Sequence, residues 1–150
     1  MKNRKVFTLI ELLAVIVIIA ILLVIAIPKV TQYISNSRKD SMISTAKNLT
    51  DSVRTSITNE IYEAPVGTDD ITIISVDLIQ LEEGSKNSSF NAKWLSQFSY
   101  VAVINVGTDM DPDYRYYVAL RDSKRYTIPL SLSGTLTRSS IVRNNTAGTT

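Results

Sequence analysis

A single acid, Glu11, lies inside the longest apolar run of the sequence. The run extends from Phe7 to Pro28 and reads FTLIELLAVIVIIAILLVIAIP. A carboxylate inside hydrocarbon is costly unless it is paired or protonated, and acids at such places are usually functional. A simpler interpretation is that Glu11, about one helical turn inside the run, reaches water at the membrane interface. The sequence therefore marks Glu11 as the first residue to explain.

A second group of acids has a carboxylate at every second position: Asp109, Asp111 and Asp113. Alternate Asp residues in a turn can chelate Ca²⁺, as the start of an EF-hand loop does. This stretch departs from that motif, because Tyr114 stands where the sharp-turn Gly belongs and Leu120 where the bidentate Glu belongs. The pattern favours a solvated acidic turn. We therefore expect no cofactor, with calcium at these three residues as the alternative.

The sequence contains no Cys and no His. Zinc sites built on those ligands are excluded, as are Cys-based and Ser-His-Asp hydrolysis. No spacing singles out a Ser-Lys pair either. We therefore expect a protein that is not an enzyme.

The charge is divided unevenly along the chain. The full sequence has 16 basic and 14 acidic residues, but three of the basic ones, Lys2, Arg4 and Lys5, precede the apolar run. Such a cluster keeps the N-terminus in the cytoplasm and sends the following chain across the membrane. Loss of residues 1–6 would leave 13 basic and 14 acidic residues, a net charge of −1. We expect no direct binding of nucleic acid, which needs a basic face.

The elements that position these residues begin with one long helix. From Phe7 to Ile27 a helix rises about 30 Å, the thickness of a bilayer core. Beyond Pro28 the pattern becomes amphipathic, and apolar residues recur at spacings of three and four. They are Met42, Ala46, Leu49, Val53, Ile57 and Ile61. The pattern predicts a helix from about residue 7 to 62, bent near Pro28, because proline removes a backbone hydrogen bond.

The second half of the chain is typical of an antiparallel sheet. After a loop at 63–70, strands are expected at 71–74, 98–106, 114–121, 124–132 and, less regularly, 136–142. A short helix at 76–83 and a polar surface loop at 83–92 separate the first two strands. Pro129 places its strand at an edge or beside a bulge. The fold class is α+β, with a long N-terminal helix packed on a small antiparallel sheet of three to four strands.

The segment from Lys5 to Glu11, KVFTLIE, resembles the class III signal of type IV prepilins and pseudopilins. In that family a membrane peptidase cuts before the Phe and methylates the new amine, and the Glu pairs with the N-terminus of a neighbouring subunit. The resemblance implies processing between Val6 and Phe7 and assembly through Phe7 and Glu11. Pro28 stands where the family often has a kinking Pro. Val6 is a departure, because the peptidase usually finds Gly, or sometimes Ala, before the cut.

The resemblance implies three segments: a leader at 1–6, a transmembrane and filament-core helix at 7–28, and an exported domain at 29–150. The implied function is a structural subunit of a type IV pilus or pilus-like surface filament. One alternative is a minor pseudopilin of a type II secretion or DNA-uptake system. Another is an uncleaved single-pass protein that displays a small binding domain. Major pseudopilins of type II secretion bind calcium in a C-terminal loop, so the family offers a precedent for the aspartate turn.

The implied partners are other copies of the chain, related pilins, the prepilin peptidase, the assembly platform protein and, before assembly, membrane lipid. The implied location is the cytoplasmic membrane, with the N-terminus inside, and then an extracellular filament. Many pilins of Gram-negative bacteria have a C-terminal disulfide loop, whereas many Gram-positive ones lack it. The absence of Cys therefore favours a Gram-positive type.

Overall fold

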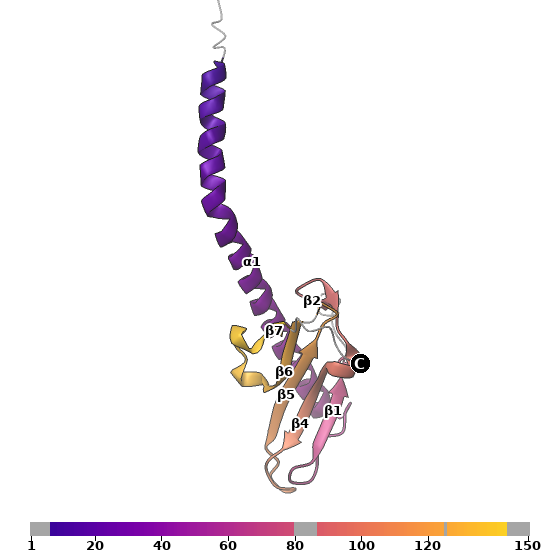
Figure 1. Ribbon diagram of the computed structural model, residues 1–150. Coiled ribbons are helices and arrows are strands. Elements are labelled where there is room, and N and C mark those ends of the chain that lie inside the picture. The colour runs from indigo at the N-terminus through magenta and orange to yellow at the C-terminus, as the bar shows by residue number, and fades with distance from the viewer. Residues whose placement is uncertain (1–6, 80–86, 125, 144–150) are drawn as a thin grey trace, which may run out of the picture. The chain divides into compact units, whose positions relative to one another are not determined.

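The computed structural model describes residues 7–79, 87–124 and 126–143. The chain forms two compact units, Met1–Ser37 and Arg38–Thr150. One helix, α1, extends from Leu9 to Thr58 and enters both (Figure 1). The predicted helix from about 7 to 62 is thus confirmed, with ends two to four residues inside the expected ones. Its polar stretch at 35–44 is helical throughout.

The first unit is helix without a covering layer. All residues from 7 to 35 are exposed, including the aliphatic ones. Helical backbone continues through Pro28, which removes one hydrogen bond without ending the helix. By length and composition, α1 is the one helix of the described residues that could cross a membrane. A helix that is apolar all round is stable only where lipid or protein surrounds it.

The second unit contains a five-stranded antiparallel sheet in the order β1-β4-β5-β6-β7 (Figure 1). Its strands are β1 Ile71–Ser75, β4 Tyr100–Asn105, β5 Tyr114–Arg121, β6 Tyr126–Leu132 and β7 Val142–Arg143. Two further strands, β2 Asn87–Ser88 and β3 Ala92–Lys93, form a small hairpin. The α+β class is confirmed. The sheet has five strands instead of the expected three to four, because β1, which pairs with β4, belongs to it as well as the short β7, which pairs with β6.

The core of the second unit lies between α1 and the sheet. Met42, Ala46, Leu49 and Val53 are fully buried. They share one core with sheet residues such as Ile74, Val101, Val103, Val118, Leu120 and Ile128. Figure 1 shows α1 crossing one face of the strands. The predicted apolar stripe therefore packs on the sheet, except that Ile61 lies beyond the helix end and is 63% exposed.

Pro129 occupies both of its predicted environments. Among the described residues, β7 pairs with β6 only at Tyr126 and Thr127, which leaves that side of β6 as an edge at Pro129. A register shift lies between Val118 and Leu120 on β5, opposite Pro129. The shift puts two residues of β6 against one of β5, which is a β-bulge. It reverses the inward and outward alternation, and Leu130 is therefore 54% exposed instead of buried.

Three expected elements differ from the structure. Residues 76–78 form a turn and residue 79 a bend, so the helix expected at 76–83 is absent there; its remainder lies outside the described residues. The expected surface loop at 83–92 contains, from Asn87 onward, the β2–β3 hairpin, and Phe90 is buried in the core. The expected strand at 136–142 is replaced by a 3₁₀ turn, η4 Arg138–Ser140, followed by β7.

Candidate processing and assembly site

The start of α1 is closed by a reciprocal pair of side chains. The Thr8 backbone N–H donates a 2.8 Å hydrogen bond to Glu11 Oε2, and the Thr8 hydroxyl donates to the same oxygen at 2.9 Å. In return the Glu11 N–H donates to Thr8 Oγ1 at 3.3 Å. This arrangement is a capping box, which satisfies backbone donors that a helix start leaves without partners. In the single chain, Glu11 is thus held by its own helix.

The other predicted residues lie on either side of this box. Phe7 immediately precedes it and is 78% exposed. Val6 lies outside the described residues. Because the nitrogen of Phe7 belongs to a peptide bond in the intact chain, it offers no ammonium group to Glu11 before a cut at that bond. The local structure therefore pairs Glu11 with Thr8 first.

Thr8 is the residue that the sequence interpretation missed. The signal was present, since Thr8-Leu9-Ile10-Glu11 has the T-x-x-E spacing of a capping box in front of an apolar run. Glu11 therefore closes the helix start in addition to placing a charge in the apolar run.

Pro28 lies on the same helix but not at the same site. The 17 residues that separate it from Glu11 correspond to about 25 Å of helix. The structure therefore brings together Phe7, Thr8 and Glu11, and leaves Pro28 as a separate feature of the apolar segment.

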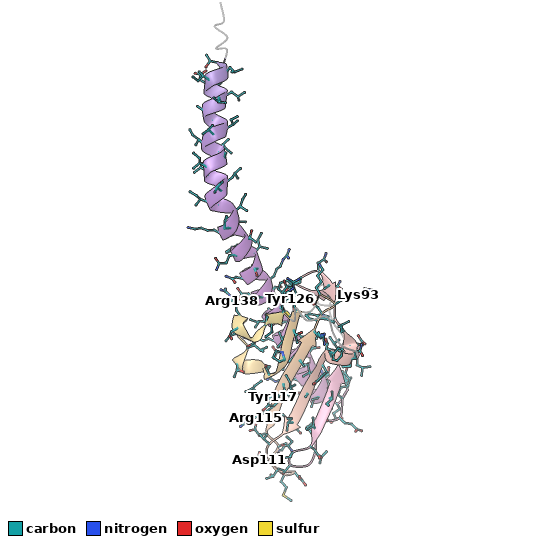
Figure 2. The ribbon with its side chains drawn as sticks, in the orientation of Figure 1. Lys93, Asp111, Arg115, Tyr117, Tyr126 and Arg138 are labelled. Atoms are coloured by element: carbon teal, nitrogen blue, oxygen red, sulfur yellow. The ribbon has the colours of Figure 1, made fainter. Side chains whose placement is uncertain are left out.

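The aspartate turn is organised by its backbone. The Thr108 N–H donates to the Asp111 carbonyl at 3.0 Å, and the Asp111 N–H donates to Thr108 Oγ1 at 3.1 Å. Figure 2 shows Asp111 at the outer tip of this turn. Within the described residues, no group of three or more Asp or Glu side chains could hold a metal ion. The structure thus places Asp109, Asp111 and Asp113 in one turn without grouping them around a common point.

The Asp122 carboxylate, directly after β5, is buried and holds neighbouring segments together by hydrogen bonds. Asp122 is fully buried. Its Oδ1 accepts hydrogen bonds from the backbone N–H groups of Lys124 and Tyr126, both at 2.9 Å. Its Oδ2 accepts a 2.6 Å hydrogen bond from the Ser88 hydroxyl. Asp122 therefore joins the β5–β6 connection to the β2–β3 hairpin. Both of its carboxylate oxygens accept hydrogen bonds, so its burial is explained by a structural role.

Comparison with known proteins matches only the N-terminal segment. Residues 1–27 match the prokaryotic N-terminal methylation motif. No curated protein and no solved structure matches the chain. The match contains Val6, Phe7, Thr8 and Glu11. The chain therefore has a class III methylation motif of the type IV pilin and pseudopilin kind at residues 1–27, followed by a long helix packed on an antiparallel sheet.

Proposed function

We propose that the chain is a structural subunit of a type IV pilus or pilus-like filament, of Gram-positive type. The observation that supports it most is the apolar half of α1, whose residues from 9 to 34 are all exposed and which lies largely within the methylation motif at 1–27. Such a surface needs lipid before assembly and neighbouring helices afterwards. The protein is anchored in the cytoplasmic membrane with its N-terminus inside, and is then drawn into an extracellular fibre.

The proposed segments are a leader at 1–6, a membrane and fibre-core helix at 7–28 and an exported domain at 29–150. A prepilin peptidase cuts between Val6 and Phe7 and methylates the Phe7 amine. An assembly platform protein then adds the subunit to other copies and related pilins. The proposed role needs no cofactor.

Glu11 changes partners in this scheme. Before cleavage its carboxylate accepts hydrogen bonds from Thr8. After cleavage a neighbouring subunit's Phe7 amine offers a full positive charge, which makes a stronger hydrogen bond than a neutral donor. A carboxylate that finds its best partner only in the fibre favours the assembled state and specifies the register between subunits.

The decisive experiment compares Glu11→Ala and Glu11→Asp with the wild-type chain in its own cells. Both variants should be inserted and cleaved, because the cut lies before the apolar run. Glu11→Ala should be almost absent from sheared fibres, and Glu11→Asp should be intermediate, since it keeps the charge with a shorter reach. Membrane and fibre fractions are compared by immunoblot. Wild-type amounts of Glu11→Ala in fibres would show that Glu11 is only a tolerated interfacial acid.

Processing is tested separately by intact mass. Subunits in fibres should begin at Phe7 and have one added methyl group. Val6→Gly should speed cleavage in a peptidase assay, because Val is unusual before the cut. Surface protein that begins at Met1 would instead support the alternative of an uncleaved single-pass protein. A minor pseudopilin would be cleaved in the same way but scarce in the fibres.

A further inference from the structure

A shallow groove of about 520 Å³ lies in the second unit, where α1 ends. Its lining is partly apolar and partly acidic: Ile57, Glu60, Tyr62, Glu63, Ala64 and Val66. The Tyr62 hydroxyl donates a 2.6 Å hydrogen bond to the Leu78 carbonyl, which fixes one wall. Val66 is 70% exposed, so part of the apolar lining of the groove is open to solvent. The groove suits an occupant that combines aliphatic and cationic groups.

Glu60 holds a backbone conformation that favours glycine. Its φ is 58°, in the left-handed region. The Ile61 N–H donates to the Ser56 carbonyl at 2.8 Å and the Glu60 N–H to the Ile57 carbonyl at 3.0 Å. These two bonds define a Schellman helix end, in which Glu60 has the position usually taken by Gly. In this conformation a Glu makes the helix end less stable than a Gly would. The strain points to a function for the Glu60 side chain.

Charges of opposite sign remain unpaired on the same unit. Within the described residues, neither Glu60 nor Glu63 forms an ion pair; those present join Arg54 to Asp51 and Arg138 to Asp40. Arg38 and Lys39, adjacent residues on α1, also form none there. Glu60, Glu63 and Arg38 are exposed and Lys39 is partly so. One chain thus presents an acidic groove and a matching pair of cations.

We propose that this groove receives Arg38 and Lys39 of a second copy of the chain. The inference depends on the proposed function, because a fibre places copies side by side. The aliphatic stems of the two cations would lie along Ile57 and Val66, and their charged ends would pair with Glu60 and Glu63. Arg38 precedes the helix end at Thr58 by 20 residues. Two parallel copies joined by this contact would therefore be offset along α1 by about 30 Å. The Phe7–Glu11 contact, which spans only four residues, would join a different pair of copies in the fibre.

Charge reversal tests the pairing in the full chain. Arg38→Glu with Lys39→Glu, and separately Glu60→Lys with Glu63→Lys, should each lower the amount in sheared fibres about tenfold, because like charges then face each other. The chain with all four changes should recover to near the wild-type amount. Asp109→Lys, a reversal of an exposed acid outside the groove, is the control and should assemble normally. Normal assembly of both double variants, or failure of the combined chain to recover, overturns the proposal.

Crosslinking tests the contact directly, because the chain has no natural Cys. Fibres of Arg38→Cys with Glu63→Cys, treated with a short bifunctional maleimide, should give a ladder of covalent multimers. The matched control, Arg38→Cys with Asp109→Cys, should give no ladder. Intact fibres of the first variant without a ladder would show that the groove is empty or holds another occupant, and would overturn the proposal.

Glu60→Gly separates the contact from folding. Gly relieves the left-handed conformation, so the detergent-solubilised full chain should unfold about 4 °C higher. The same variant should nevertheless enter fibres less well, because half of the acidic pair is lost. A stabilised chain that assembles like the wild type would count against a role for Glu60. Absence of wild-type fibres would defeat the proposed function itself, whereas wild-type fibres with unaffected charge variants would defeat only this inference.

Discussion

Asn105 is a fully buried residue that connects two loops at one end of the sheet. Its side-chain Oδ1 accepts hydrogen bonds from the N–H groups of Gly107 at 3.0 Å and Asp113 at 3.1 Å. Its Nδ2 donates to the Val66 carbonyl at 3.1 Å. The acidic turn therefore follows a path set by a buried amide, and its aspartates are free to face solvent.

Gly107 is required in that turn by close packing. An added Cβ would lie 2.3 Å from the Asp111 carbonyl oxygen and 2.5 Å from the Asp113 nitrogen. Gly107→Ala must displace backbone, and we expect a loss of about 1–3 kcal/mol in unfolding free energy. Gly134→Ala is the matched control, because a Cβ there meets nothing within 4 Å. Urea unfolding of the detergent-solubilised chains measures both; equal stabilities would contradict the steric argument.

Asp40 and Arg138 form a salt bridge on the surface of the second unit. Arg138 donates to both Asp40 oxygens, at 2.5 and 2.6 Å. These hydrogen bonds hold the pKa of Asp40 below its ordinary value of 3.8. Because the folded pKa is lowered, the contact stabilises the fold above the unfolded pKa, and this contribution is lost as the pH falls through the folded pKa.

The expected result is that Arg138→Gln raises the pKa of Asp40 back toward its ordinary value. Arg54→Gln is the control, since Arg54 pairs with Asp51 and not with Asp40. An NMR titration of the Asp40 carboxyl carbon below pH 5 gives the comparison. An unchanged pKa in Arg138→Gln would show that the pair does not persist in solution. Both side chains are about half exposed, so the effect on stability should be small.

At the scale of elements, α1 is one helix with two different surfaces. Its second part is stabilised by burial of Met42, Ala46, Leu49 and Val53 against the sheet. We expect Leu49→Ala to cost about 2–5 kcal/mol of unfolding free energy, because it leaves a cavity in a fully buried site. Lys47→Ala, an exposed change on the same helix, should cost little. Similar losses in both variants would mean that helix propensity, and not packing, decides the stability.

At the scale of the whole molecule, the two units have different requirements. Arg38–Thr150 has its own core, whereas the exposed apolar helix before it has none. A fragment that begins at Lys29 should therefore be soluble, monomeric and cooperatively folded. Reductant should not alter its unfolding, because the chain has no Cys. Sedimentation and thermal unfolding check this; persistent aggregation would indicate that the stripe of α1 prefers other subunits to the sheet.

The sequence by itself determined the features that depend on local pattern. The apolar run and the spacing from Phe7 to Glu11 predicted the membrane-type helix and the methylation motif, because both are properties of consecutive residues. The spacing from Met42 to Val53 predicted the face that packs on the sheet. The strand expected at 114–121 matches the observed bounds of β5.

Only the tertiary structure decided the features that depend on distant partners. Phe90 is buried because its hairpin packs against Tyr126, with ring centres 3.5 Å apart. Asp40 meets Arg138 across 98 residues of sequence. The bulge opposite Pro129 leaves Leu130 54% exposed, although Ile128, two residues earlier, is fully buried. In each case the outcome depends on which surfaces meet, and periodicity within one segment has no information about the surface opposite.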